Sequence, residues 1–175
     1  MEMLGVPGLK ILPAKGEETA PAGLAPDALV QALASHKAHE VARLCGAGDV
    51  VIAADTIVWH GGRVYGKPHD EKEAADMLRA LSGDRHEVFT GVSVMRDGRE
   101  ELACERSVVR FRELSDAEIA AYIATGEPMD KAGAYGAQGK AALFVEGIDG
   151  DFFNVMGLPL CLLGRMLRKQ GVALL

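Results

Sequence analysis

Hydrophobic residues recur along the chain at two different spacings, and these spacings predict helices and strands in alternation. Over residues 27–44 the apolar positions follow the helical period, which predicts an amphipathic helix. Residues 49–58 form an almost continuous apolar run and predict a buried strand. The glycines at 61–62 then predict a turn into a second strand.

Two later helices are predicted by polar residues placed where a helix begins. Asp70 and Ser115 are each followed three residues later by a glutamate, which is the spacing of a capping box. The first of these helices is expected to end after Leu81, where a serine and a glycine follow. The second is expected to end at Gly126 and Pro128.

The remaining apolar runs complete the pattern of an α/β protein. Residues 87–95 and 101–112 flank an Asp-Gly pair at 97–98, which predicts a tight hairpin. A further strand is expected over residues 141–148 and a last helix over residues 159–170. Because strands and helices alternate while one hairpin is antiparallel, the pattern predicts a mixed-sheet α/β domain.

Composition places the chain among globular proteins. It has 175 residues, 49% hydrophobic and 25% charged, with a net charge of −6 and no run of basic residues, so nucleic acid is not an expected partner. No apolar stretch is long enough to span a bilayer, so no membrane partner is expected either. Three widely spaced cysteines without a Cys-x-x-Cys pattern are typical of a reducing compartment. We therefore expect a soluble, cytoplasmic protein.

The segment most suggestive of chemistry is the decapeptide 130–139, Asp-Lys-Ala-Gly-Ala-Tyr-Gly-Ala-Gln-Gly. Three glycines within seven positions require a tight turn or a close approach of the backbone to another group. The same ten residues carry a carboxylate, an ammonium, a phenol and a carboxamide, and backbone N–H groups beside a lysine suit a phosphate. An ordered structural turn is the alternative interpretation.

Three charged residues lie where structure alone does not explain them. Lys37 interrupts the apolar stripe of the first predicted helix, so its ammonium must reach solvent, pair with an acid or face a cleft. Asp55 lies within the first apolar strand, where an ionised carboxylate is costly unless it is paired or binds a metal. Lys67, in a Gly-Lys-Pro tripeptide, carries a point charge suited to phosphate. For Asp55 the pattern favours function over a structural hydrogen bond.

Several short motifs follow one another through nearly the whole chain. They are Ala54-Asp55-Thr56, Gly66-Lys67-Pro68, Leu81-Ser82-Gly83, Thr90-Gly91-Val92, Gly126-Glu127-Pro128, the decapeptide 130–139 and Val155-Met156-Gly157-Leu158-Pro159. In this order and at these spacings they resemble the Maf family, the septum-formation-inhibitor-like nucleoside triphosphate pyrophosphatases. The Gly-Lys-Pro element alone would mean little, but the ordered set is specific.

That resemblance implies one Maf-like domain over residues 1–175, with a two-lobed α/β fold, an elongated mixed sheet and a deep central cleft. It also implies hydrolysis of a nucleoside triphosphate to the monophosphate and pyrophosphate with the help of Mg²⁺ or Mn²⁺. The text of the Ala-Asp-Thr motif and of the decapeptide resembles the branch that acts on dTTP and UTP. A homodimer is left open.

The resemblance also assigns roles to single residues. Asp55 matches the catalytic proton acceptor and a metal ligand, and Glu18 matches a second metal ligand. Lys37 and Lys67 match substrate-binding residues that hold phosphates. Thr56 and Gln138 match positions linked to substrate choice. A Gln carboxamide both donates and accepts hydrogen bonds, so it suits the carbonyl and ring N–H edge of a pyrimidine.

One part of the family pattern is not matched by this sequence. Family members begin with a strand and a Ser-x-Ser-Pro-Arg-Arg loop, whose arginines would grip a triphosphate, whereas residues 1–6 here resemble the end of the helix that follows. We expect an N-terminally truncated domain, either from a start codon assigned too far downstream or from a shortened protein. The alternative functions are a catalytically weak nucleotide-binding regulator of cell division and septum formation, and a purine-directed enzyme acting on ITP or XTP.

Overall fold

A computed structural model describes residues 4–6, 8–16 and 23–174. Its α-helices are α1 (Pro26–Ala42), α2 (Glu71–Leu81), α3 (Asp116–Ile123), α4 (Phe152–Val155) and α5 (Leu160–Lys169). Its strands are β1 (Val50–His60), β2 (Arg63–Tyr65), β3 (Arg85–Arg96), β4 (Arg99–Phe111) and β5 (Val145–Asp149). Short 3₁₀ helices follow α3, namely η2 (Glu127–Asp130), η3 (Ala132–Ala134) and η4 (Lys140–Leu143). No helix in these ranges is long and apolar enough to cross a membrane.

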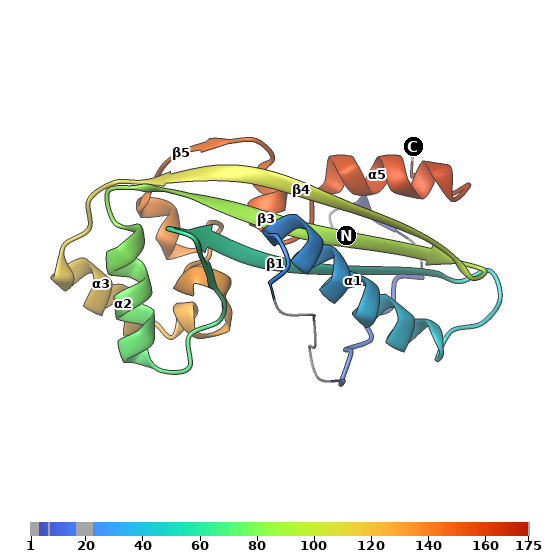
Figure 1. Cartoon of the computed structure of the whole chain (residues 1–175), viewed down its shortest axis with the longest axis horizontal. Coiled ribbons are helices and arrows are strands. Elements are labelled where there is room, and N and C mark those ends of the chain that lie inside the picture. The colour runs from blue at the N-terminus through green and yellow to red at the C-terminus, as the bar shows by residue number, and fades with distance from the viewer. Residues whose placement is uncertain (1–3, 7, 17–22, 175) are drawn as a thin grey trace. The chain divides into compact units, whose positions relative to one another are not determined.

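The strands form one five-stranded sheet in the order β2-β1-β3-β4-β5, with helices beside it (Figure 1). The sheet is antiparallel rather than mixed, which corrects that part of the prediction. For β1–β2 and β3–β4 the physical reason lies in the connections, since only antiparallel strands can be joined by two-residue turns such as those at 61–62 and 97–98. Asp97 and Gly98 both have positive φ, 49° and 78°, as a tight hairpin turn requires. The α/β class is confirmed, and the central cleft stays a prediction.

Most predicted elements form within a few residues of the expected bounds, but two differ. Residues 140–143 are the 3₁₀ helix η4 instead of the start of a strand, because the N–H groups of Ala142 and Phe144 bond to carbonyls three residues back. The strand β5 therefore begins only at Val145. The short helix α4 was not predicted; its N-terminus is capped by Asp151, which accepts a hydrogen bond from the N–H of Phe153 at 2.7 Å.

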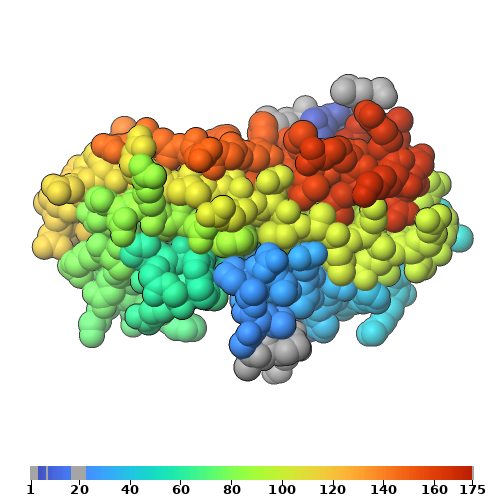
Figure 2. Space-filling view, turned by 45° about the horizontal axis from the view of Figure 1, so that its top comes forward, coloured from blue at the N-terminus to red at the C-terminus, as the bar shows by residue number. Residues whose placement is uncertain are grey.

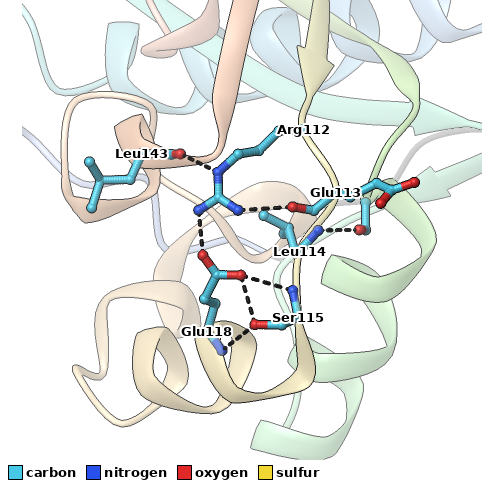
Figure 3. Close-up of polar contacts among 7 residues, drawn as sticks. Arg112, Glu113, Leu114, Ser115, Glu118 and Leu143 are labelled. Atoms are coloured by element: carbon cyan, nitrogen blue, oxygen red, sulfur yellow. Dashed lines mark hydrogen bonds and ion pairs between the residues drawn. The ribbon is translucent and has the colours of Figure 1, made fainter.

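The predicted caps of α2 and α3 are confirmed. Asp70 accepts a hydrogen bond from the N–H of Glu73 at 2.7 Å, although Glu73 reaches back to the N–H of His69 instead of closing a full capping box. Ser115 and Glu118 do form the full box, and Glu118 also pairs with Arg112 (Figure 3). The pairing with Arg112, followed by the bonds from Ser115, lowers the pKa of Glu118 to about 2.

The chain divides into two compact units, and β1, β3 and β4 each contribute residues to both. One unit holds the described residues up to Asp55 together with Gly91–Cys104 and 160–174. Its small apolar cluster forms around Ala38, Val51 and Met95. In this unit α5 adjoins the β3–β4 hairpin, as the red and yellow-green surfaces in Figure 2 show, and Lys169 forms an ion pair with Glu101 at 2.8 Å.

The same unit contains a close approach between α1 and β3. A Cβ atom added at Gly91 would lie 2.3 Å from both the carbonyl carbon and the carbonyl oxygen of Val30. The obstacle is the backbone of a helix, which cannot yield as a flexible side chain can. Glycine is therefore required at position 91 by packing, and it fixes where α1 lies against the strand.

The second unit comprises Thr56–Thr90 and Glu105–Pro159 and holds the larger apolar core, in which α2 packs against α3. At its centre His86, 1% exposed, stands edge-on to Phe111 and Tyr135. Its Nε2 lies 2.7 Å from the Tyr135 hydroxyl. Burial lowers the pKa of His86 to about 4, so the ring is neutral at pH 7.

Candidate active site

Lys37 and Asp55 form an ion pair between α1 and β1. Of the three outcomes expected for Lys37, pairing with an acid is therefore the one observed. The side chains are 23% and 11% exposed, so most of each is removed from water but neither is sealed off. A carboxylate and an ammonium thus lie side by side at a place that solvent can reach, which suits proton transfer and binding of an anionic group.

The Gly-Lys-Pro tripeptide lies against the decapeptide 130–139. The N–H of Gly133 donates to the carbonyl of Gly66 at 3.0 Å, which fixes the segment that carries the exposed Lys67. Within the decapeptide Asp130 pairs with Lys131 at 2.5 Å. That contact, with a smaller contribution from the charge of Lys67, lowers the pKa of Asp130. Two lysines and one aspartate therefore gather where these segments meet.

Two glycines of the decapeptide, Gly133 and Gly139, lie in close approach to other groups, as predicted, and those groups are side chains of the protein. Gly133 has φ of +68°, and a Cβ there would lie 2.8 Å from a methyl group of Val58. Tyr135 points into the core and bonds to His86, so it is structural and not part of a site. Gln138 is exposed, and it directly follows the buried Ala137. The decapeptide is thus an ordered turn that presents one carboxamide to solvent.

A carboxylate that the sequence did not single out holds this turn in place. Glu127 accepts hydrogen bonds from the Tyr122 hydroxyl at 2.9 Å and from the N–H of Lys140 at 3.1 Å. The Tyr122 oxygen in turn accepts from the N–H of Gly136 at 3.1 Å, and burial raises the pKa of this tyrosine. Glu127 therefore supports the turn on both sides of Gln138. The Gly-Glu-Pro motif was the available signal, but the partners of Glu127 belong to other elements, five and thirteen residues away.

Thr56 follows Asp55 directly in β1 and has different partners, because consecutive strand residues point to opposite faces. Its hydroxyl lies 2.9 Å from that of Thr90, a fully buried residue of β3. Thr90 belongs to a motif that the sequence had flagged without assigning a role to this residue. Thr56 is thus held by a polar contact with the core of the second unit.

A divalent cation bound beside these described residues would have to be held mainly by substrate. Within residues 4–6, 8–16 and 23–174, no group of three or more His, Cys, Asp or Glu side chains is placed to hold a metal ion. Mg²⁺ needs only one or two carboxylates when phosphate oxygens and water complete its shell. Asp55 meets that requirement as one such carboxylate. Glu18, the other predicted ligand, lies outside the described residues.

The predicted site residues therefore fall into two groups. Lys37 and Asp55 are brought together in the first unit. Thr56, Lys67 and Gln138 belong to the second unit, where Lys67 and Gln138 lie on segments joined by a backbone hydrogen bond.

Comparison with known proteins places this arrangement in a family. Residues 1–170 match the family of Maf-like proteins. The chain is 49% identical over 164 residues to a dTTP/UTP pyrophosphatase of Pelotomaculum thermopropionicum, covering 93% of this chain and 85% of the relative. It is 52% identical over 149 residues to a dTTP/UTP pyrophosphatase of Bacillus pumilus, covering 85% and 78%. A Bacillus cereus protein of the same name is 45% identical over 172 residues, covering 98% and 89%. The chain belongs to the Maf family.

Proposed function

We propose that this protein is a nucleoside triphosphate pyrophosphatase that hydrolyses dTTP and UTP to the monophosphate and pyrophosphate. The observation that carries the proposal is the Lys37–Asp55 pair, which provides a base and a cation in a chain whose relatives bear that name. Modified pyrimidine triphosphates are further candidate substrates. The homodimer stays a prediction that the mass of the protein in solution would test.

In this proposal Asp55 accepts a proton from a water molecule, and the elements of water add across the bond between the α- and β-phosphates. The monophosphate and pyrophosphate are the products. Lys37 lies against the Asp55 carboxylate, where its ammonium also attracts phosphate oxygens. Lys67, exposed beside the decapeptide, provides a second positive charge for the phosphates. A Mg²⁺ or Mn²⁺ ion held by Asp55 and Glu18 would neutralise phosphate charge when bound.

The pyrimidine base is assigned to Gln138 and Thr56. The Gln138 carboxamide both donates and accepts, so it can pair with a ring N–H and a neighbouring carbonyl of uracil or thymine. Its exposure on a turn braced by Glu127 supports this role, since a fixed reader discriminates better than a mobile one. Thr56 contributes a hydroxyl whose orientation is fixed by Thr90.

The test is release of pyrophosphate from a panel of triphosphates by the full chain with Mg²⁺ or Mn²⁺. We expect dTTP and UTP to be the best substrates, and a chelator to stop the reaction until metal is restored. Asp55→Asn should lower kcat by about a hundredfold or more while calorimetry still detects bound dTTP. Asp149→Asn, an exposed carboxylate at the end of β5, is the matched control and should keep full activity.

Three results would contradict the proposal in different ways. Full activity of Asp55→Asn would show that another group is the base. Binding of dTTP by the wild type without any turnover would favour the nucleotide-binding regulator. A clear preference for ITP or XTP would favour the purine-directed enzyme.

A further inference from the structure

Thr56 is the outer end of a chain of polar groups that leads into the core of the second unit. Its Oγ1 lies 2.9 Å from Thr90 Oγ1, which lies 3.1 Å from the backbone carbonyl oxygen of Asn154. Thr90 and Asn154 are fully buried, whereas Thr56 is only half-buried. The chain therefore connects a fixed interior to a hydroxyl that a ligand can reach.

Asn154, at the inner end of this chain, cannot easily turn away. Its side-chain amide donates to the carbonyl of Val88 and to the hydroxyl of Ser107, each at 3.0 Å. Its own backbone carbonyl also accepts a hydrogen bond from the N–H of Gly157 at 2.9 Å. A carbonyl oxygen accepts two hydrogen bonds, so the bond from Thr90 completes its set.

These contacts determine which hydroxyl donates to which. A carbonyl oxygen can only accept, so the single hydroxyl proton of Thr90 must be the one shared with Asn154. The opposite arrangement would place two buried acceptors face to face without a proton between them, which is costly. Thr90 therefore has only a lone pair to offer Thr56, and Thr56 must donate inward. Toward a ligand, the Thr56 oxygen is left with lone pairs alone.

We propose that Thr90 is a positioning residue that makes Thr56 a hydrogen-bond acceptor and thereby selects thymine and uracil over cytosine. This rests on the proposed function, in which Thr56 meets the base. Thymine and uracil carry a hydrogen on ring N3, whereas cytosine has a lone pair there. A hydroxyl that can only accept therefore bonds to the N3–H of thymine and uracil and is repelled by the N3 lone pair of cytosine. A freely rotating hydroxyl would serve all three. The Gln138 carboxamide, which shares this edge of the base, can also turn over to pair with cytosine, so the fixed hydrogen-bond polarity originates in Thr90.

The inference is tested by removing the hydroxyl of Thr90 while keeping its shape. In Thr90→Val the side chain still fills the same space, but the Thr56 proton is released and can turn toward the ligand. We expect the ratio of kcat/KM for dTTP to that for dCTP to fall by about tenfold, the scale of one buried hydrogen bond. Activity on dCTP should rise as activity on dTTP falls. Thr90→Ser keeps the proton order and should keep the ratio.

A matched control removes a buried hydroxyl from the same strand without touching Thr56. Ser93, also fully buried in β3, donates to Glu100 at 2.7 Å. Ser93→Ala should change kcat/KM for dTTP and for dCTP by the same factor, as any general loss of stability would. An unchanged ratio in Thr90→Val, or equal losses on both nucleotides, would overturn the inference and leave the proposed function standing.

A second readout does not depend on turnover. Calorimetry measures the affinities for dTMP and dCMP. In Thr90→Val the ratio of these affinities should fall as the ratio of kcat/KM values does. If no triphosphate is hydrolysed, the proposed function fails, and this binding measurement alone decides the role of Thr90. Equal affinities of the wild type for dTMP and dCMP would refute that role.

Discussion

Gly139 and Glu127 should be coupled strongly enough for a double-mutant cycle to detect. A Cβ atom at position 139 would lie 2.1 Å from Glu127 Oε1, so Gly139→Ala must displace that carboxylate. The φ of −104° does not itself exclude alanine, although the ψ of −150° lies outside the common regions and adds backbone strain that is the same with and without Glu127. The cost that depends on Glu127 is the loss of the bonds that this carboxylate accepts from Tyr122 and Lys140. Allowing for partial exposure, this loss is about 2 kcal/mol.

Glu127→Ala removes the same two bonds, so it should also cost about 2 kcal/mol. In the double variant the bonds can be lost only once, and the obstacle to a methyl group at position 139 has gone. Gly139→Ala should then cost only the backbone strain of its φ and ψ, offset in part because alanine restricts the unfolded chain. The expected coupling energy is therefore about 2 kcal/mol.

Urea unfolding of the four proteins measures this coupling directly. Gly164→Ala is the matched control, since a Cβ there would meet no atom within 4 Å, and its effect should be the same with and without Glu127. If Gly139→Ala costs as much in the Glu127→Ala background as in the wild type, then the carboxylate is not the obstacle. The same result would refute the claim that Glu127 braces the turn carrying Gln138.

Two further predictions concern stability. Gly91→Ala should lower the free energy of unfolding by about 3 kcal/mol or more, because the new methyl group meets the backbone of Val30. Urea unfolding measures this change, and a loss below about 1 kcal/mol would contradict the prediction. His86 takes up a proton below about pH 6.5 when unfolded but only near pH 4 when folded, so the unfolded chain binds more protons between these values. The free energy of unfolding should therefore fall by up to about 3 kcal/mol as the pH is lowered through this interval. His86→Gln should flatten that fall, and an equal slope in the variant would contradict the assignment.

The features that could be predicted from the sequence are those that short segments determine by themselves. The caps at Asp70 and Ser115 involve groups within a few residues of each other, and the turn at 97–98 needs only its own two residues. Local chemistry of this kind is visible in any sequence window. The pairing of Lys37 with Asp55 was open to prediction for another reason, because a charge in an apolar pattern requires a partner.

The features that escaped prediction depend on contacts between distant segments. Tyr135 was noted only as the phenol of a decapeptide suggestive of chemistry, yet its hydroxyl meets His86 and its ring packs in the core. Glu127 and Thr90 were named only as members of motifs and were given no role, because the groups that they contact come from other elements. The prediction of a mixed sheet was also wrong, because the alternation of strands and helices does not determine which strands become neighbours or in which direction they run.

The contact between Gly91 and Val30 has a consequence for how the site tolerates sequence change. Lys37 lies seven residues after Val30 in α1, which is about two helical turns, so both residues lie on the same side of the helix. The distance between α1 and β3 at this point is set by backbone touching backbone, without a side chain as spacer. Any side chain at position 91 would therefore push α1 away from the strand at this point and would shift the helix that carries the ammonium of Lys37.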